Sequence, residues 1–301
     1  MQPDIETYIR PHIDTTLESQ KWLQQSQKHE KLLSDILDPY LEKRSRQIND
    51  PVLDFLFKYY HFRPAQLMRW SPGVGIAIET PDSTAVLPEI SELTIDRNRA
   101  YLDPANFPDN RKESAVWILE LLEKSTSSKP SFGCFGMHEW AMVYKADKVR
   151  HNQLPLRMER DKLAEFVESR PLVCTHFDAF RFFTREARPM NKYDLSRQNF
   201  LQNEQAGCIH TNMDLYKWAF KMYPWISSDR IRDAFLLAVD ARYTDMQASP
   251  YDLRSHGLEP ICIETEEGRQ IYLTKQKEIY EKSRPIRQKL IEEYRKLICN
   301  F

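Results

Sequence analysis

The chain has 301 residues and a formal net charge of −1, and 41% of its residues are hydrophobic while 29% are charged. These proportions are typical of a globular protein and exclude a disordered or fibrous chain. The 7 glycines against 18 prolines disfavour β-barrels and Gly-rich nucleotide loops, and favour helices joined by Pro-containing connections. The balanced charge counts against a dedicated DNA-binding protein, whose affinity usually depends on a basic surplus.

Cysteine usage and the absence of targeting signals bear on location. The 5 cysteines are dispersed and form no C-x-x-C pair, so we expect reduced thiols in a cytosolic protein. Residues 1–6 lack the basic start and apolar stretch of a secretory signal. No apolar run reaches the roughly 20 residues of a membrane-spanning helix. The expected location is the cytoplasm, with no membrane partner.

The first predicted element is a charged helical arm over residues 1–50, in which Pro39 favours a kink or a new helix start. Residues 52–60 are too apolar for a surface helix and should be buried. Pro64 fits the first turn of a further short helix. Residues 73–79 indicate a short strand or extended segment.

Longer helices are predicted in the rest of the chain. Residues 113–124 carry apolar side chains at helical spacing. Ser228 is the predicted N-cap of a helix that ends near Asp245. Thr265 begins another helix, in which Pro285 favours an interruption. The sequence therefore predicts a mainly α protein: the N-terminal arm, and one compact helical domain over the remaining residues, 51–301.

A histidine and a carboxylate stand next to each other on a predicted apolar helix face. Glu139 has Phe135 and Val143 at the two positions four residues away, and its neighbour His138 has Cys134. Burying an unpaired carboxylate costs several kcal/mol, so Glu139 must be neutralised or have a cationic or metal partner. This makes His138 and Glu139 candidate catalytic residues. The alternative is a buried glutamate bonded to a distant arginine for structural reasons.

The segment 174–183 holds a second group of polar residues among four phenylalanines. As an extended segment it places His176 and Asp178 on one face. As a helix start it places Asp178 at capping-box spacing from Thr175, which explains Asp178 without any chemistry. Capping does not explain His176 or Arg181, and their surroundings favour a pocket. His176 and Asp178 are therefore also candidate catalytic residues.

A third group begins at His210, which stands four residues before Asp214, the spacing at which two helical side chains share a face. Thr211 and Asn212 are alternative N-caps, which would leave His210 just outside the helix. Asp214 lies close in sequence to Lys217, and a solvated or capping role is the simpler interpretation of this carboxylate.

No H-E-x-x-H, G-x-S-x-G, Walker or dinucleotide motif is present. A divalent metal is nevertheless a candidate cofactor, because three histidines each have a carboxylate within four residues. The candidate ligands of such a site are His138, Glu139, His176, His210 and Asp214.

Aromatic and guanidinium groups close to these segments suit a planar ring or an anion. Residues 59–70 combine both kinds, although an aromatic core segment with arginines that reach the solvent is the simpler interpretation. The candidate substrate-binding residues are Trp140, Phe180, Arg181, Tyr216, Arg63 and Arg69.

Several runs of the sequence together suggest a family. They are DFLFKYY (54–60), RPAQLMRWSPG (63–73), GMHEWAMVY (136–144), HFDAFRFF (176–183), MDLYKW (213–218), and ASPYDL (248–253) with IET (263–265). From about residue 50 onward the chain resembles a bacterial family whose members are commonly labelled 3-methyladenine DNA glycosylase. The Gly-rich hairpin and following aspartate of helix-hairpin-helix glycosylases are absent.

The resemblance implies an N-glycosidic hydrolase of DNA base repair, which stacks an alkylated purine on aromatic rings. Because such a base is already a cationic leaving group, the reaction mainly needs stacking and a carboxylate near an oxocarbenium-like transition state. The implied partner is alkylated DNA or a purine-like small molecule. Two alternatives remain open: a metal-dependent oxidoreductase or hydrolase acting on a small molecule, and a non-enzymatic helical binding module.

Overall fold

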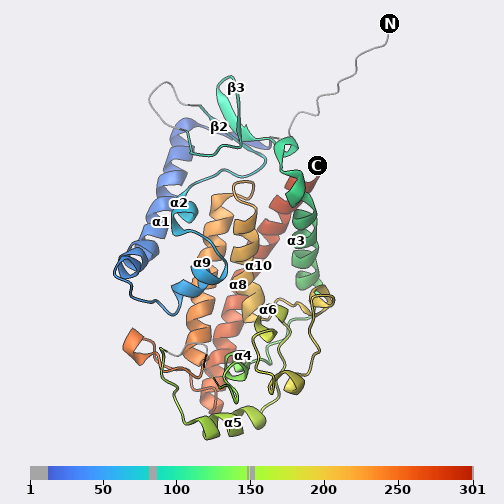
Figure 1. The fold of residues 1–301 in the computed structure, drawn as a ribbon. Helices are drawn as coiled ribbons and strands as arrows, with labels where there is room; N and C mark the ends of the chain where they lie inside the picture. The colour runs from blue at the N-terminus through green and yellow to red at the C-terminus, as the bar shows by residue number, and fades with distance from the viewer. Residues whose placement is uncertain (1–12, 81–86, 148, 150–152, 300–301) are drawn as a thin grey trace.

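The computed structural model describes residues 13–80, 87–147, 149 and 153–299, and it is mainly helical, as the sequence predicts (Figure 1). None of the helices in these ranges combines the length and the apolar character needed to cross a membrane. The strands are β1 (Thr15–Leu17), β2 (Ile76–Glu79), β3 (Leu93–Asp96) and β4 (Arg99–Leu102). The α-helices are α1 (Ser19–Ser45), α2 (Pro64–Met68), α3 (Asp109–Ser127), α4 (Met137–Ala141), α5 (Arg160–Glu168), α6 (Phe177–Phe180), α7 (Phe200–Asn203), α8 (Ile209–Lys221), α9 (Ser228–Ala248) and α10 (Glu266–Ile298). Short π and 3-10 turns are η1 (Phe55–Tyr59), η2 (Pro104–Asn106), η3 (Arg188–Met190) and η4 (Arg254–His256).

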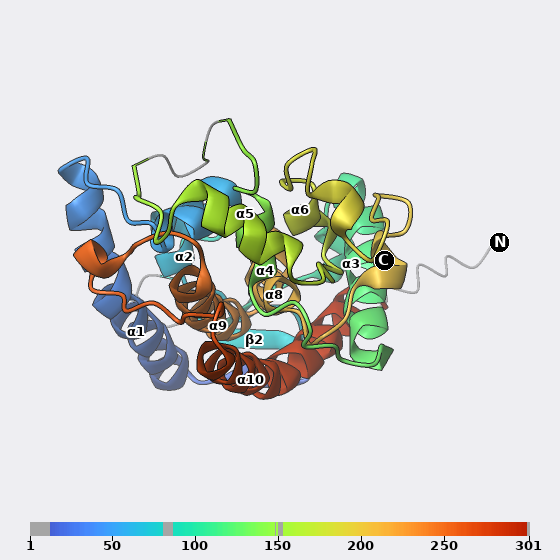
Figure 2. The same cartoon turned by 90° about the horizontal axis from the view of Figure 1, so that it is seen from below.

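Three helices form the centre of the molecule. Helix α8 packs against both α9 and α10, and α3 packs along the C-terminal part of α10 (Figures 1 and 2). Because α8 is covered on several sides, nearly all of its residues are buried, polar ones included. Buried polar groups are stable only when they are hydrogen-bonded or paired. The polar side chains of α8 must therefore find partners inside the protein.

Helix α1 belongs to the main core rather than to a separate arm. Its Leu33, Leu37 and Tyr40 are buried in the same apolar cluster as α8 and α9, so residue 50 does not divide two cores. Residues 1–12 of the predicted arm lie outside the described residues. Helix α1 continues through Pro39, so the new helix start that the sequence allowed there does not occur, and α10 continues through Pro285 without the expected interruption. Packing along both helices offsets the hydrogen bond that each proline removes.

A four-stranded sheet lies at one end of the helices, in the order β1-β2-β4-β3 (Figure 1). The β1–β2 pair is parallel and the other two pairs are antiparallel. Only β2, which lies in the apolar run 74–78, was expected from the sequence; β1, β3 and β4 lie in more polar stretches without a clear alternation pattern. A small second core between the sheet and α1 contains Trp22, Trp70 and Ile78.

Most of the predicted helix boundaries agree with the structure. Helix α2 begins at Pro64, and α3 covers the predicted segment 113–124 with extra residues at both ends. The N-cap of α9 is Ser227 rather than Ser228. The Ser227 side chain accepts a hydrogen bond from the Arg230 amide, whereas the Ser228 hydroxyl donates to the Arg69 carbonyl. Thr265 caps α10, as predicted, by accepting a hydrogen bond from the Gly268 amide at 3.0 Å.

Replacing this cap should weaken the protein by a small, measurable amount. Thr265→Ala removes the acceptor for the Gly268 amide, and we expect the free energy of unfolding to fall by about 1 kcal/mol. Thr274→Ala is the matched control, because the Thr274 hydroxyl only donates to a carbonyl within α10. Urea denaturation of the two variants checks this; an equal loss in both would contradict the capping role.

Candidate functional site

The three histidines singled out in the sequence lie in a row. The His138 and His210 ring centroids are 4.3 Å apart, and the His176 and His210 rings stack with centroids 5.4 Å apart. His138 comes from α4, His176 from the start of α6 and His210 from the first turn of α8. All three are buried. Segments separated by long stretches of chain therefore meet at one place.

A cavity of about 720 Å³ opens beside this row, within the size range of small-molecule sites. Its aromatic lining consists of Phe55, Tyr59, Tyr60 and Phe182. Its polar lining includes Glu139, His176, Asp178, Arg181, His210, Asp214 and Arg242. The cavity thus combines flat apolar surfaces with groups that can exchange protons.

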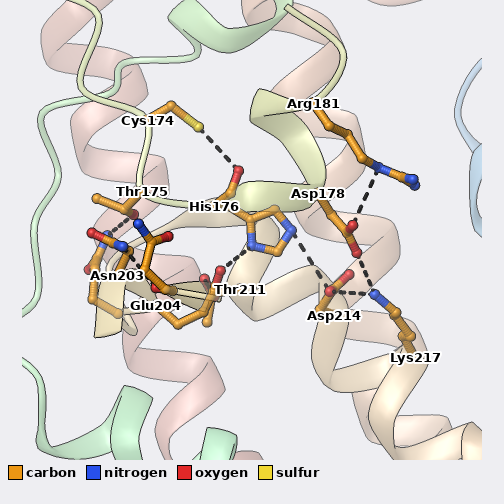
Figure 3. Close-up of polar contacts among 12 residues, drawn as sticks. Cys174, Thr175, His176, Asp178, Arg181, Asn203, Glu204, Thr211, Asp214 and Lys217 are labelled. Carbon is orange, nitrogen blue, oxygen red and sulfur yellow. Dashed lines mark hydrogen bonds and ion pairs between the residues drawn. The ribbon is translucent and has the colours of Figure 1, made fainter. Parts of the chain in front are cut away.

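His176 lies between two buried carboxylates, Glu204 and Asp214 (Figure 3), and it lines the cavity. Its Nδ1 lies 2.7 Å from Oε1 of Glu204, whose other oxygen accepts the Thr211 hydroxyl. Its Nε2 is 3.8 Å from Asp214, which is beyond hydrogen-bond distance. Burial lowers the pKa of His176, but the negative charges of Glu204 and Asp214 outweigh this and raise the pKa above its ordinary value. The arrangement orients an imidazole for general acid–base work.

One ammonium group bridges two carboxylates across from His176 (Figure 3). The Lys217 Nζ lies 2.8 Å from Asp178 and 3.1 Å from Asp214, and the Tyr60 hydroxyl donates to Asp214 at 2.6 Å. Burial raises the pKa of Asp178, but Lys217 outweighs it and holds this pKa below the usual range. The Arg181 Nε also lies 3.3 Å from Asp178, so two carboxylates meet two cations and their charges balance at this wall of the cavity.

The structure corrects the capping and solvated roles that the sequence suggested for residues in this region. Asp178 makes no capping bond at the start of α6 and binds Lys217 instead. Asp214 is buried, not solvated. Helix α8 begins at Ile209, so His210 lies inside the helix and neither Thr211 nor Asn212 is its cap. Asp178 and Asp214 both have partners that are distant in sequence, Lys217 and Tyr60 respectively.

A second buried network contains His138 and Glu139. The Arg242 guanidinium contacts Glu139 at 2.8 Å and Asp245 at 2.6 Å, and His138 Nε2 lies 2.7 Å from Asp245. Glu139 thus has the cationic partner that its burial demanded, and this partner is a distant arginine. Burial lowers the pKa of His138, but the charge of Asp245 outweighs it and raises this pKa well above the ordinary value. Phe55 covers Arg242, whose guanidinium carbon is 4.3 Å from the ring centroid.

His210 differs from the two histidines that flank it. Burial and the positive charge of His138 lower the pKa of His210 well below its ordinary value, so this ring is neutral. Its Nδ1 has no hydrogen-bond partner among the described residues. The row therefore consists of a neutral imidazole between two that are more basic than usual.

Two groups of side chains have the spacing of metal ligands, with ligand atoms within 4.8 Å of one another: His138, His210 and Asp245, and His176, Asp178 and Asp214. Cations already bind the carboxylates of both groups: the buried Arg242 contacts Asp245, and the partly exposed Lys217 contacts Asp178 and Asp214. A metal ion would have to displace these cations. The predicted ligand Glu139 belongs to neither group. A metal cofactor stays a prediction, and charge balance at both groups is achieved without one.

Only one of the predicted substrate-binding residues lines the cavity, and it is Arg181. Trp140, Phe180 and Tyr216 are buried in the main core, because large rings on short or central helices pack inward. Trp140 also donates its indole N–H to the Ala248 carbonyl. Arg63 and Arg69 are exposed and outside the cavity lining.

Sequence reasoning missed several residues of the site. Arg242 and Asp245 follow Phe235 and Ala238 at helical spacing on an apolar face, the pattern that pointed to Glu139, so the same reasoning would have found Arg242. Glu204 stands in a polar run, 202–205, that reads as a surface loop. No local signal distinguishes Glu204 from a solvated glutamate.

No protein-family model, no curated protein and no solved structure matches this chain. The resemblance to the family labelled 3-methyladenine DNA glycosylase therefore stays a prediction. The function has to be inferred from the residues of the site.

Removing the charge of Glu204 should lower the pKa of His176. The raised pKa means that folding favours protonated His176; this stabilisation is present below the ordinary pKa and is lost as pH rises through the raised one. Glu204→Gln keeps an acceptor but removes the charge, so the ring should titrate at lower pH. An NMR titration of the histidine ring measures this. Thr211→Val is the control, because it removes a hydrogen bond to Glu204 but keeps the charge; equal shifts in both variants would contradict the electrostatic cause.

Proposed function

We propose that the protein is a hydrolase that cleaves the N-glycosidic bond of an alkylated purine nucleotide or nucleoside, with His176 as the general base. The observation that carries this proposal is the Glu204–His176 pair at the wall of a cavity with four aromatic rings. One side of the imidazole is fixed by Glu204. The other side lies 3.8 Å from Asp214 without a hydrogen bond, and both His176 and Asp214 line the cavity. This is the arrangement by which a histidine activates a nucleophile in hydrolases.

The aromatic lining suits a cationic ring system. A purine alkylated on a ring nitrogen carries a positive charge, which aromatic faces attract. Asp178 and Asp214 are paired with Lys217 and Arg181, so the preference for a cation rests on the aromatic faces. A neutral, unmodified purine would gain stacking but not the electrostatic term, so the site favours the alkylated base.

The reaction balances without any further group. A water molecule bound at Nε2 of His176 gives a proton to that nitrogen, and its oxygen attacks the anomeric carbon of the sugar. The bond from this carbon to the ring nitrogen breaks, and its electron pair neutralises the alkylated base. The Asp214 carboxylate, which lines the cavity 3.8 Å from His176, stabilises the oxocarbenium-like transition state. Arg181 and Lys58, which also line the cavity, are placed to meet a phosphate group.

The test is release of free base by the purified full-length chain from alkylated duplex DNA, alkylated single-stranded DNA and an alkylated nucleoside. Release from any of the three supports the proposal, and the relative rates identify the substrate. If no base is released from any of them at any salt concentration, the proposal fails.

The same assay separates the alternatives. A metal-dependent enzyme, the second prediction from the sequence, would lose activity with a chelator and contain stoichiometric metal after purification. The proposed mechanism predicts full activity after chelation, because Lys217 and Arg242 already neutralise the carboxylates. A binding module without activity would bind alkylated base or nucleoside and leave it intact.

A further inference from the structure

Three of the cysteines that are dispersed in the sequence gather around a second, much smaller cavity. Cys134, Cys174 and Cys208 line a space of about 10 Å³ together with His138 and His210, room for one water-sized group at most. Cys174 and Cys208 are buried, whereas Cys134 is partly exposed. Of the thiols at this cavity, Cys134 is therefore the one that a reagent from solution can reach.

Cys134 is the first member of a hydrogen-bonded chain. Its Sγ lies 3.4 Å from Nδ1 of His138, whose Nε2 lies 2.7 Å from Asp245. Arg242 also contacts Asp245, at 2.6 Å, so this carboxylate is the acceptor for Nε2. Nδ1 is then the ring nitrogen that faces the Cys134 sulfur. A thiol whose proton is shared with an anchored imidazole is a prepared nucleophile.

Two buried polar atoms at this cavity have no hydrogen-bond partner among the described residues. They are Nδ1 of His210 and Oε1 of Gln276, and both residues line the cavity. Gln276 is only 1% exposed and His210 only 7%. An unpaired buried polar atom costs about 1–3 kcal/mol, so the cavity is built to receive a small group that can hydrogen-bond.

We propose that Cys134 is a site of reversible oxidation by hydrogen peroxide, and that the hydroxyl of the resulting sulfenic acid occupies this small cavity. The thiolate sulfur attacks one peroxide oxygen, so that an S–O bond forms and the O–O bond breaks. The leaving hydroxide takes a proton from His138 and departs as water. Sulfur loses two electrons and the peroxide gains them. The new hydroxyl can donate to Gln276 or His210, which supplies the missing partner.

This proposal does not depend on the reaction in the large cavity, and exposure alone predicts the opposite order of reactivity. Cys299 is the most exposed cysteine, and Cys262 is partly exposed, like Cys134. Arg157 approaches the Cys262 sulfur at 3.6 Å, and no histidine among the described residues hydrogen-bonds to it. If accessibility governed oxidation, Cys299 would react first. The histidine contact predicts that Cys134 does.

The experiment treats the full-length chain with equimolar hydrogen peroxide in the presence of a sulfenic-acid-specific diketone, and locates the adduct by peptide mass spectrometry. We expect Cys134 to be labelled at least about tenfold faster than Cys299. The variant Cys134→Ser should lose this fast adduct while Cys299 is labelled as before. Labelling of Cys299 as fast as Cys134, or no adduct on Cys134, would overturn the proposal.

His138→Asn tests the activating contact itself. The proposal expects the rate at Cys134 to fall to that of Cys262, with circular dichroism confirming that the variant is folded. An unchanged rate in the folded variant would show that His138 plays no part. If this variant does not fold, the comparison between Cys134 and Cys299 within the wild-type chain decides the question by itself.

Discussion

Replacing Arg242 by Met should lower the free energy of unfolding by about 3–5 kcal/mol, because it leaves Glu139 and Asp245 buried without their shared cation. Both carboxylates and the guanidinium are at most 5% exposed, so water cannot take over its role. Met matches the length of the arginine stem and keeps the contact with Phe55. The loss therefore reports the charge and not a cavity. Chemical denaturation at neutral pH measures it.

The control is another arginine in an ion pair, Arg284, which contacts Glu281 on the outer face of α10. Both members of this ion pair are well exposed, and solvated pairs of this kind contribute little to the free energy of unfolding. Arg284→Met should leave the denaturation midpoint unchanged. Equal effects of the two substitutions would show that the buried network around Arg242 does not depend on its cation.

Replacing His176 by Asn should reduce base release roughly 100- to 10,000-fold, the usual contribution of a general base. Asn retains a donor for Glu204 but cannot take a proton from water. Because the aromatic rings of the cavity are unchanged, the loss should fall on kcat and leave KM close to that of the wild-type protein. Steady-state kinetics measures both constants, on whichever alkylated substrate the protein cleaves fastest in the release assay.

His256→Asn is the matched control, since His256 is exposed in η4 and does not line the cavity. It should leave kcat unchanged. A loss in His176→Asn that appears only in KM would assign His176 to binding, and activity equal to that of the wild-type protein would exclude it as the base.

Much of the fold was predictable because its signals are local. The N-cap at Thr265, the proline start of α2 and the apolar spacing in α3 each depend on a few consecutive residues. The continuity of α1 and α10 through their prolines was not predictable, because it depends on packing along the whole helix. The short strands also depend on partners that are distant in sequence.

Only the part of the site with local signals in the sequence could be predicted. Burial of Glu139 could be predicted from its helical neighbours, and the demand for a cation followed, but the identity of Arg242 depends on how α4 meets α9. His176 was singled out because no capping role explained it. Its partner Glu204 was missed, because a polar loop residue gives no sign of burial until the start of α8 is placed beside it. Asp178 and Asp214 had adequate local explanations, and those explanations were wrong.

The most direct test of the proposed mechanism is the pH dependence of base release by wild-type protein and by Glu204→Gln, compared with the NMR titration of His176. If His176 is the base, kcat/KM should rise with pH through the raised pKa of this ring, and in Glu204→Gln the rise and the ring titration should both move to lower pH. A rise that stays in place while the ring pKa moves, or a rate independent of pH over this range, would contradict His176 as the general base.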